Sequence, residues 1–340
     1  MSFLARAAVV EGFERLVADL GGDARRVYEK AHTSPEQLRD ADARVPLETL
    51  RRILNASAEE TGCDHFGLEL GKRRNPDTTM GILGQVFQSA RSFGEAIASM
   101  FELFHIHSEA SLWQLQTEAG RCYAIVSFLY EDEASSKQSQ QQVIAVLWRL
   151  FSMITQGKWH PIMLSFTFAR PRDLAPYRQT FGVPIEFDAD SCGIVFHQAD
   201  LDLPVSRWNA DLHRSLYQKA QQLFPARAEG IAETTRTLVR KNLEIRRVGQ
   251  QYVTQFFPFE RRTLQRRLKE QGTSYQQILT EVRVAMAKDA LRSSSISLSQ
   301  LSDRLCYCDV ANFTHAFKAQ EGMTPRQWRT KHVRRESADR

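Results

Sequence analysis

The segment from Glu260 to Glu270, with the sequence ERRTLQRRLKE, constrains this chain more than any other feature. Its two leucines, Leu264 and Leu268, are four residues apart, which places them on one face of an α-helix. The candidate contacts to DNA are Arg261, Arg262, Gln265, Arg266 and Lys269. Arginine pairs bidentately with guanine, glutamine pairs with adenine and lysine neutralises phosphate. The segment predicts a helix anchored in a core with a polar face suited to a DNA major groove, and a solvated basic face is the simpler alternative.

Further helices are predicted on both sides of this segment. Upstream, Arg247–Phe257 is expected to form the preceding helix. Downstream, apolar residues at helical spacing predict a long connecting helix, a short helix, a turn and a last helix. These predicted elements are Tyr275–Arg292, the segment marked by Leu298, Leu301 and Leu305, the turn Cys306–Cys308, and Asp309–Gln320. The order is a helix–turn–helix, a connecting helix and a second helix–turn–helix.

The last predicted helix is amphipathic, like the basic segment. Phe313 and Phe317 are four residues apart and are expected to point into a core. The outward candidates for DNA contact are Asn312, His315 and Lys318. In a helix–turn–helix, the second helix enters the major groove while the first crosses the backbone. The basic segment and the last helix are therefore the two predicted recognition helices.

Long ordered motifs fill the C-terminal part of the chain. They are RTLQRRLKEQGTSYQQILTEVRVAMAKDAL, which begins at Arg262, and SLSQLSDRLCYCDVANFTHAFKAQEGMTPRQWR, which begins at Ser297. Over roughly residues 229–331 the chain resembles the C-terminal domain of the AraC family of bacterial transcription regulators. Residues 25–222 resemble the effector-binding region of the arabinose-binding type in that family. The residues that carry this second resemblance are Pro171, Tyr177, Arg178, Phe181–Phe187 (FGVPIEF), Ala189 and Leu201–Pro204 (LDLP).

The resemblance implies both a fold and a function. The fold class would be an α+β N-terminal effector domain followed by an all-α DNA-binding domain with two helix–turn–helix motifs. The function would be sequence-specific transcription regulation, usually activation, with promoter or operator double-stranded DNA and RNA polymerase as partners. The N-terminal domain would bind a small-molecule effector of the sugar, amino acid or fatty acid class, and a homodimer is compatible with it. No cofactor is implied. A purely oligomerising N-terminal domain is the alternative.

Two turns depart from the family pattern. Where the family has glycine and a small cap such as serine in the first motif, this chain has Phe257-Pro258-Phe259-Glu260, and glutamate is a poorer helix cap than serine. In the second motif, Cys306 takes the place of the turn glycine, Cys308 that of the cap, and His315 that of a common outward arginine. We therefore expect the first recognition helix to read most bases and the second mainly to position the protein.

Charge is segregated along the chain. Residues 227–340 carry 22 Lys and Arg against 12 Asp and Glu, a net charge of +10, whereas the other 226 residues carry 23 and 28, a net charge of −5. A basic C-terminal segment in an otherwise acidic chain is expected if one domain binds phosphate groups. The predicted divisions are an effector-sensing or oligomerisation domain at 1–224, a linker at 225–230, a DNA-binding domain at 231–332 and a tail at 333–340.

The N-terminal domain is expected to mix helices and strands. The predicted helices are Gly12–Leu20, Leu47–Thr61 (with Pro46 at its start), Ile82–Ala90, Phe93–Phe104 (capped by Ser92), Gln138–Thr155 and Trp208–Phe224. The predicted strands are Ser111–Glu118, Cys122–Tyr130, Ile162–Ala169 and Gly193–Phe196, with a hairpin turn at Ala119-Gly120.

Other motifs offer weaker alternatives. Cys306 and Cys308 could join His315 around a metal ion, but a structural zinc site needs four ligands, so no metal site is predicted. The His105-x-His107 pair is expected to be structural or exposed, with a metal or effector role as the alternative, and Glu131-Asp132-Glu133 is expected to be a solvated loop, with cation binding as the alternative. Four aromatic residues lie on elements that could line a pocket, but they are expected to belong to the ordinary core: Trp113, Tyr123, Phe128 and Trp148.

Cysteine usage bears on both activity and compartment. A fused DNA-repair methyltransferase would need a reactive cysteine in a Pro-Cys-His-like setting, and Cys63, Cys122 and Cys192 have other neighbours. The chain is therefore expected not to be an enzyme.

Five scattered cysteines fit a reducing cytosol. No apolar run approaches the roughly 18 residues of a membrane span, and the N-terminal apolar run is too short for a signal peptide, so a cytoplasmic protein is predicted.

Overall fold

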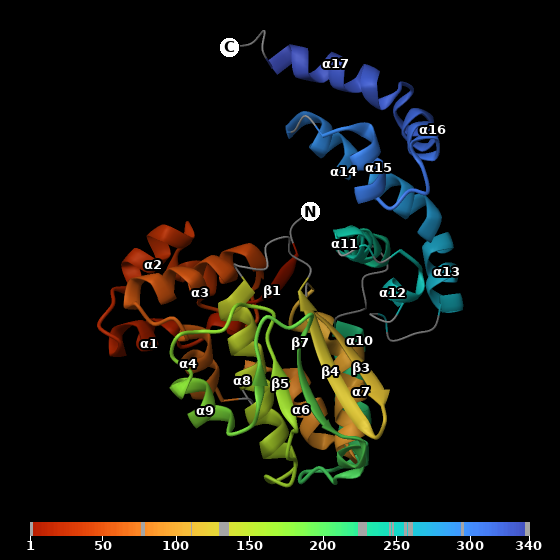
Figure 1. The fold of residues 1–340 in the computed structure, drawn as a ribbon. Coiled ribbons are helices and arrows are strands. Elements are labelled where there is room, and N and C mark those ends of the chain that lie inside the picture. Colours follow the sequence, from red (N-terminus) through yellow and green to blue (C-terminus); the bar gives the residue numbers. More distant parts are fainter. Residues whose placement is uncertain are drawn as a thin grey trace. The chain divides into compact units, whose positions relative to one another are not determined.

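The computed structural model describes residues 3–75, 79–109, 111–128, 136–223, 230–244, 246, 248–254, 257, 261–293 and 296–336. The chain divides into two compact units, an N-terminal unit of residues 1–226 and a C-terminal unit of residues 227–340 (Figure 1). The predicted fold class is confirmed. The N-terminal unit combines helices with two sheets, and every regular element described in the C-terminal unit is a helix.

The N-terminal unit begins with a small helical layer. Its elements are β1 (Leu4–Arg6), α1 (Phe13–Asp19), α2 (Ala24–Ala31), β2 (Arg44–Pro46) and α3 (Leu47–Thr61). Apolar residues recur on one face of α3 at Leu50, Ile53 and Leu54, and each is at most 1% exposed. Asp23 caps α2 because its carboxylate accepts a hydrogen bond from the Arg25 backbone at 2.8 Å. This layer therefore has its own apolar core.

A five-stranded sheet follows. Its strands are β3 (Ser111–Glu118), β4 (Arg121–Phe128), β5 (Met163–Ser165), β6 (Ile185–Glu186) and β7 (Cys192–His197), in the order β3-β4-β7-β5-β6. Only β5 and β6 pair in parallel; the other neighbours are antiparallel. The hairpin from β3 to β4 turns at Ala119 and Gly120, whose φ angles are 49° and 75°. Positive φ at both central residues is typical of the type I′ turn, which matches the twist of the strands.

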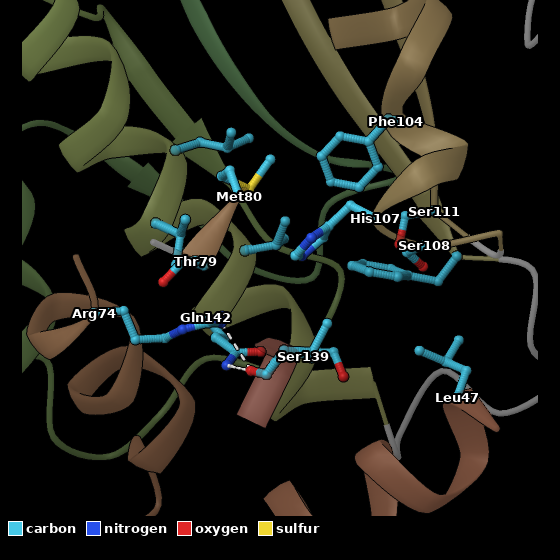
Figure 2. Close-up of a pocket in the computed structure, with 15 residues that line it drawn as sticks. Leu47, Arg74, Thr79, Met80, Phe104, His107, Ser108, Ser111, Ser139 and Gln142 are labelled. Atoms are coloured by element: carbon cyan, nitrogen blue, oxygen red, sulfur yellow. Dashed lines mark hydrogen bonds between the residues drawn. The ribbon is translucent and has the colours of Figure 1, made fainter. Parts of the chain in front are cut away.

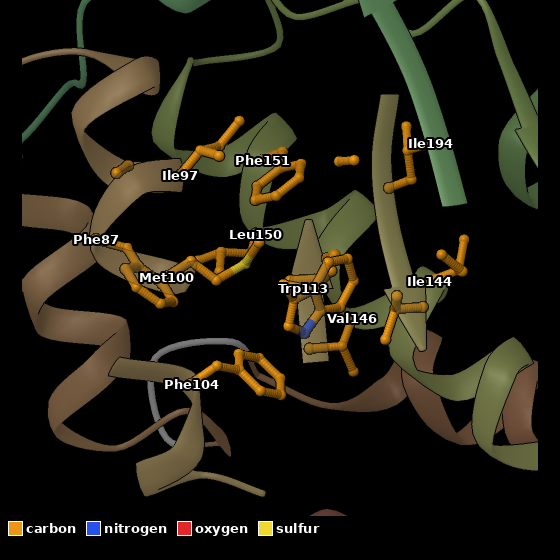
Figure 3. Close-up of a cluster of buried hydrophobic side chains, with 14 of the residues drawn as sticks. Phe87, Ile97, Met100, Phe104, Trp113, Ile144, Val146, Leu150, Phe151 and Ile194 are labelled. Carbon is orange, nitrogen blue, oxygen red and sulfur yellow. The ribbon is translucent and has the colours of Figure 1, made fainter. Parts of the chain in front are cut away.

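Helices pack against this sheet around one apolar core. They are α4 (Phe66–Arg73), α6 (Ile82–Ser89), α7 (Phe93–Leu103), α8 (Lys137–Ile154), α9 (Ala175–Phe181) and α10 (Ala210–Leu223). Short 3₁₀ helices lie at η1 (Ala7–Val10), η2 (Pro35–Leu38), η3 (Phe104–Ile106) and η5 (Gln198–Asp202). Figure 3 shows Phe87 of α6, Met100 of α7, Trp113 of β3, Leu150 of α8 and Ile194 of β7 gathered in the core. Each is at most 5% exposed, so helices and sheet share the same buried contacts.

Two glycines let α4 lie unusually close to α8. A Cβ atom at Gly67 would stand 2.0 Å from the carbonyl oxygen of Gln138, and one at Gly71 would stand 2.7 Å from the Cβ of Ala145. The backbone N–H of Gly67 also donates to Gln138 Oε1 at 2.8 Å. At the end of α4, the Arg149 guanidinium of α8 donates to the carbonyl of Arg74. These contacts fix Arg74 beside α8.

The C-terminal unit is built from α11 (Gly230–Glu244), α12 (Gln251–Thr254), α13 (Arg261–Glu270), α14 (Tyr275–Ser293), α15 (Leu298–Arg304), α16 (Val310–Glu321) and α17 (Pro325–Glu336). Leu291, Leu301, Phe313, Phe317 and Trp328 form its apolar cluster together with neighbouring aliphatic side chains. The Phe313 and Phe317 rings meet edge to face, with centroids 5.9 Å apart. Consequently α14, α15, α16 and α17 share one core.

Most of the predicted elements are confirmed. The helix Leu47–Thr61 and the strand Ser111–Glu118 have the predicted bounds, and the predicted turn at Ala119-Gly120 is present. The connecting helix α14 extends one residue beyond its predicted end. The observed α1, α6, α7, α8, α10, β4 and β7 differ from their predicted ranges by one or two residues at their described ends.

Two predictions were wrong in extent and one in the position of a proline. The strand predicted over Ile162–Ala169 spans only Met163–Ser165, because the backbones of Phe166 and Phe168 bond to a loop around Asp188. Of the helix predicted over Arg247–Phe257, the described residues form a helix only at Gln251–Thr254. Pro46 occupies the cap position before α3 rather than its first turn. The helices α2, α4, α9, α11 and α17 and the strands β1, β2 and β6 were not predicted.

Some predictions fall on residues that the structure does not describe. These are the acidic loop Glu131-Asp132-Glu133, residues 225–229 of the predicted linker, and Pro258-Phe259-Glu260 of the first turn. The predicted tail at 333–340 begins within a helix, because α17 continues to Glu336.

Candidate nucleic-acid interface

The first predicted recognition helix, α13, is anchored by two leucines. Leu264 and Leu268 are both 0% exposed, as the sequence predicted. The exposed side chains are those of the predicted contacts Arg261, Arg262, Gln265, Arg266 and Lys269. With one buried and one exposed face, the helix can pack on the core of the C-terminal unit through its leucines while its cationic and amide groups face outward.

Gln250, at the start of α12, holds two of these side chains. Its amide oxygen accepts hydrogen bonds from Arg261 Nε and from Gln265 Nε2, each at 3.1 Å. Gln250 is 7% exposed, so this acceptor is buried while its two donors belong to exposed residues. Sequence reasoning missed Gln250 because an isolated glutamine in a turn before a short helix carries no periodic signal.

Three other cations of α13, Arg262, Arg266 and Lys269, are available to an incoming anion. Arg266 pairs with Glu270 one turn later, with Nη1 and Oε1 3.2 Å apart, and both side chains are more than half exposed. Such an exposed pair contributes little and exchanges readily for another acceptor. Within the described part of the chain, Arg262 and Lys269 make no hydrogen bond or ion pair. These groups can therefore meet phosphate or a base edge without breaking a buried interaction.

The second helix–turn–helix is locally well specified. Ser297 begins α15 with a capping box, in which its hydroxyl and the Gln300 side chain each bond to the other's backbone. After α15 the chain turns at Cys306, whose φ of 56° lies in the left-handed region that favours glycine. Arg283 of α14 stabilises this turn, since its Nη2 donates to the Cys306 carbonyl at 2.6 Å and its guanidinium stacks over the Tyr307 ring.

Asp309, and not Cys308, caps the second recognition helix. It has extended backbone angles, and its carboxylate accepts the Asn312 backbone N–H at 2.7 Å. The expectation of a cysteine cap was wrong, because α16 begins one residue later than the resemblance to the family implied. Aspartate also suits the positive end of the helix dipole.

The faces of α16 are as predicted. Phe313 and Phe317 are both 0% exposed, whereas Asn312, His315 and Lys318 are exposed. The Asn312 side chain donates to Asp309 Oδ2 at 2.9 Å, which ties its amide to the helix start. His315 and Lys318 make no hydrogen bond or ion pair among the described residues. The structure thus places the eight predicted contacts on the exposed surfaces of two helices joined by α14.

A separate cavity of about 50 Å³ lies in the N-terminal unit. Figure 2 shows Arg74, Thr79, His107, Ser139 and Gln142 around it, together with apolar side chains. The residues come from segments far apart in the chain, and apart from His107 of the His105-x-His107 pair no sequence motif indicated them. Phe128 also lines the cavity; it was one of the aromatic residues considered for a pocket from the sequence.

The described residues contain no group of three or more His, Cys, Asp or Glu side chains placed to hold a metal ion. Among the helices described here, none is both long enough and apolar enough to cross a membrane.

Comparisons with known proteins identify the family. Residues 21–205 match the family model for the arabinose-binding domain of AraC transcription regulators, N-terminal, and residues 254–331 match a helix-turn-helix domain. The chain is 24% identical to the ornithine utilization regulator of Pseudomonas aeruginosa, over 96% of each chain. It is 26% identical to the HTH-type transcriptional regulator VirS of Mycobacterium tuberculosis, again over 96% of each.

A crystal structure of the transcriptional regulator CdpR from Pseudomonas aeruginosa aligns with 94% of this chain and 98% of its own, at 19% identity and a TM-score of 0.45. The first family model alone spans more than half of the chain. With two helix–turn–helix motifs at its C-terminal end and this N-terminal match, the chain belongs to the AraC family of DNA-binding transcription regulators.

Proposed function

We propose that this regulator recognises a specific promoter or operator through α13 and α16, and that a small molecule bound in the N-terminal unit controls this recognition. The observation that carries the DNA-binding assignment is α13 itself. Its leucines are buried while four arginines and lysines of its outer surface, Arg261, Arg262, Arg266 and Lys269, are exposed.

The proposed contacts differ in kind. Arg266 and Gln265 would read base edges, because guanidinium and amide groups match guanine and adenine in the major groove. Arg262 and Lys269 would contact phosphate, which fixes position without carrying sequence information. Arg261 is held by Gln250 near the start of the helix. On the second helix, Asn312, His315 and Lys318 would make fewer base contacts and would mainly position the protein.

Two observations support effector control. The N-terminal unit belongs to a domain class named for ligand binding, and it contains a cavity with both polar and apolar walls. The name of one relative, the ornithine utilization regulator, also connects that protein with a metabolite. For occupancy to matter, the ligand must prefer the DNA-binding arrangement, and a tenfold preference is worth about 1.4 kcal/mol.

Activation through RNA polymerase, homodimerisation and a cytoplasmic location belong to the same proposal and rest on family membership. A dimer has additional support from α10. Leu212 and Leu223, which are 49% and 56% exposed, lie three helical turns apart and so face the same side. The proposal assigns the chain no catalytic step.

The test uses the purified full chain and fluorescent DNA from the region flanking its own gene. Sugars, amino acids and carboxylic acids are first screened for thermal stabilisation, and each hit is then added to the DNA titration. We expect at least one compound both to stabilise the protein and to change operator affinity several-fold, with no change on a scrambled duplex. If the operator is bound but no compound does both, the purely oligomerising alternative replaces effector control.

A further inference from the structure

The cavity of the N-terminal unit is lined by a buried cation, Arg74, that forms no ion pair with any described residue, although the Glu11 carboxylate raises its pKa from a longer distance. Arg74 is 6% exposed, and its guanidinium donates to the backbone carbonyls of Ala8 and Val9. Its Nε–H has no acceptor. Among the described residues, no carboxylate lies within ion-pair distance of this guanidinium, which has five N–H donors in all. Burying a charge without a counter-ion is costly, so a site of this kind favours an anion from outside.

A second arginine adds positive charge to the same region. Arg6 is 5% exposed, and its Nη1 donates to the Thr79 carbonyl at 2.8 Å. The same nitrogen lies 3.5 Å from His107 Nδ1. Arg6 does have a counter-ion, Asp42 at 2.6 Å, but the Asp42 side chain is 76% exposed and lies toward solvent. The side of Arg6 that faces Thr79 and His107 therefore keeps a positive potential.

His107 reports this potential. Burial lowers the pKa of His107 well below its ordinary value, and the charges of Arg74, Arg6 and Arg44 lower it further. The imidazole is therefore neutral near pH 7 and supplies no compensating charge. Burial also lowers the pKa of Arg74, to about 9, so that its guanidinium stays protonated at neutral pH.

The rest of the cavity has one polar and one apolar wall. The Thr79 hydroxyl is buried without a hydrogen-bond partner, and Ser139 offers a second hydroxyl from α8. The apolar wall includes Met80, Phe104 and Val146. In Figure 2, Arg74 extends from the end of α4 toward Gln142, while the rings of Phe104 and His107 lie on another side. An inorganic anion would satisfy the cation but not the apolar wall.

We infer that this cavity binds a small aliphatic monocarboxylate, whose carboxylate pairs with Arg74 and whose alkyl end contacts Met80, Phe104 and Val146. A volume of about 50 Å³ has room for roughly four water molecules. The ligand is therefore a short acid of the size of propionate to pentanoate. The inference rests on the proposed effector control, because it names the chemical class of the effector.

The experiment is calorimetric titration of the full chain with sodium butyrate, with butyramide as an uncharged probe of the same shape and sodium chloride as the salt control. We expect butyrate to bind and butyramide and chloride not to bind. Propionate and pentanoate should bracket butyrate in affinity, whereas longer acids should bind less tightly because the cavity cannot hold them. Binding of butyramide as tightly as butyrate, or no binding of any short acid at millimolar concentration, overturns the inference.

Variants connect the binding to the cavity. Arg74→Gln should weaken butyrate at least tenfold, and Arg74→Lys, which keeps the charge, should weaken it less. Arg172→Gln removes an exposed arginine of the same unit and should leave affinity unchanged. Because Arg74→Gln removes a buried hydrogen-bonding group and could unfold the protein, Thr79→Val serves as a second variant. It keeps the side-chain shape, removes the unpartnered hydroxyl and should weaken butyrate several-fold. Wild-type affinity in a folded Arg74→Gln or Thr79→Val protein contradicts the assignment.

A spectroscopic readout reports the site without any DNA. A bound carboxylate should raise the pKa of His107, because a negative charge stabilises the imidazolium. Titration of histidine-labelled protein by NMR, with and without butyrate, measures this shift; an unchanged His107 with butyrate bound would place the ligand elsewhere.

The two proposals fail in different ways. If butyrate binds through Arg74 but does not change operator affinity, the site assignment holds and effector control fails. If a sugar or an amide changes operator affinity while no short acid binds, effector control holds and the carboxylate assignment fails.

Discussion

The side chain of Gln250 orients part of the candidate DNA surface before any DNA is present. Its buried oxygen accepts from both Arg261 and Gln265, and each such bond contributes about 0.5–1.5 kcal/mol. A restrained side chain loses less conformational freedom when it binds. Arg266 and Lys269 lack this restraint, so they can adapt to the groove. The same helix therefore combines two oriented side chains with two adaptable ones.

Single substitutions should separate base reading from phosphate binding. Arg266→Ala or Gln265→Ala is expected to cost about 1–3 kcal/mol of operator affinity and to relax preference at one or two base pairs. Lys269→Ala should weaken operator and non-specific DNA alike, because a phosphate contact carries no sequence information. His315→Ala should lose less specificity than Arg266→Ala. Equilibrium binding to a set of single-base operator variants measures all four effects.

Lys158→Ala serves as the control for charge loss, since Lys158 is an exposed lysine of the N-terminal unit. It should leave operator affinity unchanged. An equal or larger loss of specificity for His315→Ala than for Arg266→Ala would reverse the proposed ranking of the two helices.

Asp309 gives a second prediction at the scale of one residue. Asp309→Ala removes the acceptor of the Asn312 backbone N–H, and loss of such a cap costs about 1 kcal/mol. Amide hydrogen exchange at the first turn of α16 should therefore become about fivefold faster. Asp309→Asn keeps a capping oxygen and should exchange nearly as slowly as the original chain. Equal exchange in the alanine and original proteins would mean that Asp309 does not stabilise the helix start.

At the scale of elements, the sequence predicted best where one helical period dominates. The connecting helix α14 and the recognition helices have apolar residues at helical spacing, and the buried faces predicted for α13 and α16 are confirmed. Helix α4 was missed because Gly67 and Gly71 weaken its helical signal. These glycines allow α8 to approach α4 closely, and this tertiary contact produces no helical pattern in the sequence. The strand β5, which begins at Met163, was predicted too long. Phe166 and Phe168 are buried and alternate with other residues as in a strand, but their backbones form hydrogen bonds with a loop.

The candidate sites differ in how much the sequence reveals. The exposed cations of α13 follow from composition and spacing alone. Gln250 and Asp309 bond to residues of α13 and α16, and Arg283 contacts the turn before α16; such individual contacts are not indicated by a helical period. Arg74 and His107 line the same cavity only because the chain folds, so a buried arginine without an ion-pair partner there could be recognised only in the folded unit.

The length of α14 leads to a prediction about the DNA footprint. Its 19 residues span about 28 Å at 1.5 Å per residue, and successive major grooves on one DNA face are about 34 Å apart. Hydroxyl-radical footprinting should show two protected segments about one helical turn apart. Replacing Arg262, Arg266 and Lys269 by alanine should remove one segment, and replacing Asn312, His315 and Lys318 should remove the other. A single protected segment with the original protein would mean that α16 does not contact the DNA.

At the scale of the whole molecule, charge and structure are divided at nearly the same place. The net charges of +10 for residues 227–340 and −5 for the preceding 226 residues coincide with the two compact units. Proteins that neutralise phosphates release condensed counter-ions, so their affinity falls as salt rises. An acidic N-terminal unit is repelled by the same phosphates. Non-specific DNA binding should therefore come from the C-terminal unit alone.

Salt titration of the full chain and of two fragments tests this division. The full chain and the fragment 227–340 should bind DNA with the same slope of log affinity against log salt, and the fragment 1–226 should not bind. Each phosphate contact adds about −0.9 to that slope on double-stranded DNA, so Lys269→Ala should make it shallower by about 1. Gln265→Ala should reduce operator affinity without changing the slope, because an amide contact to a base releases no counter-ion. Binding by the fragment 1–226, or equal slopes for the original and Lys269→Ala chains, would contradict the assignment of phosphate binding to α13 and its unit.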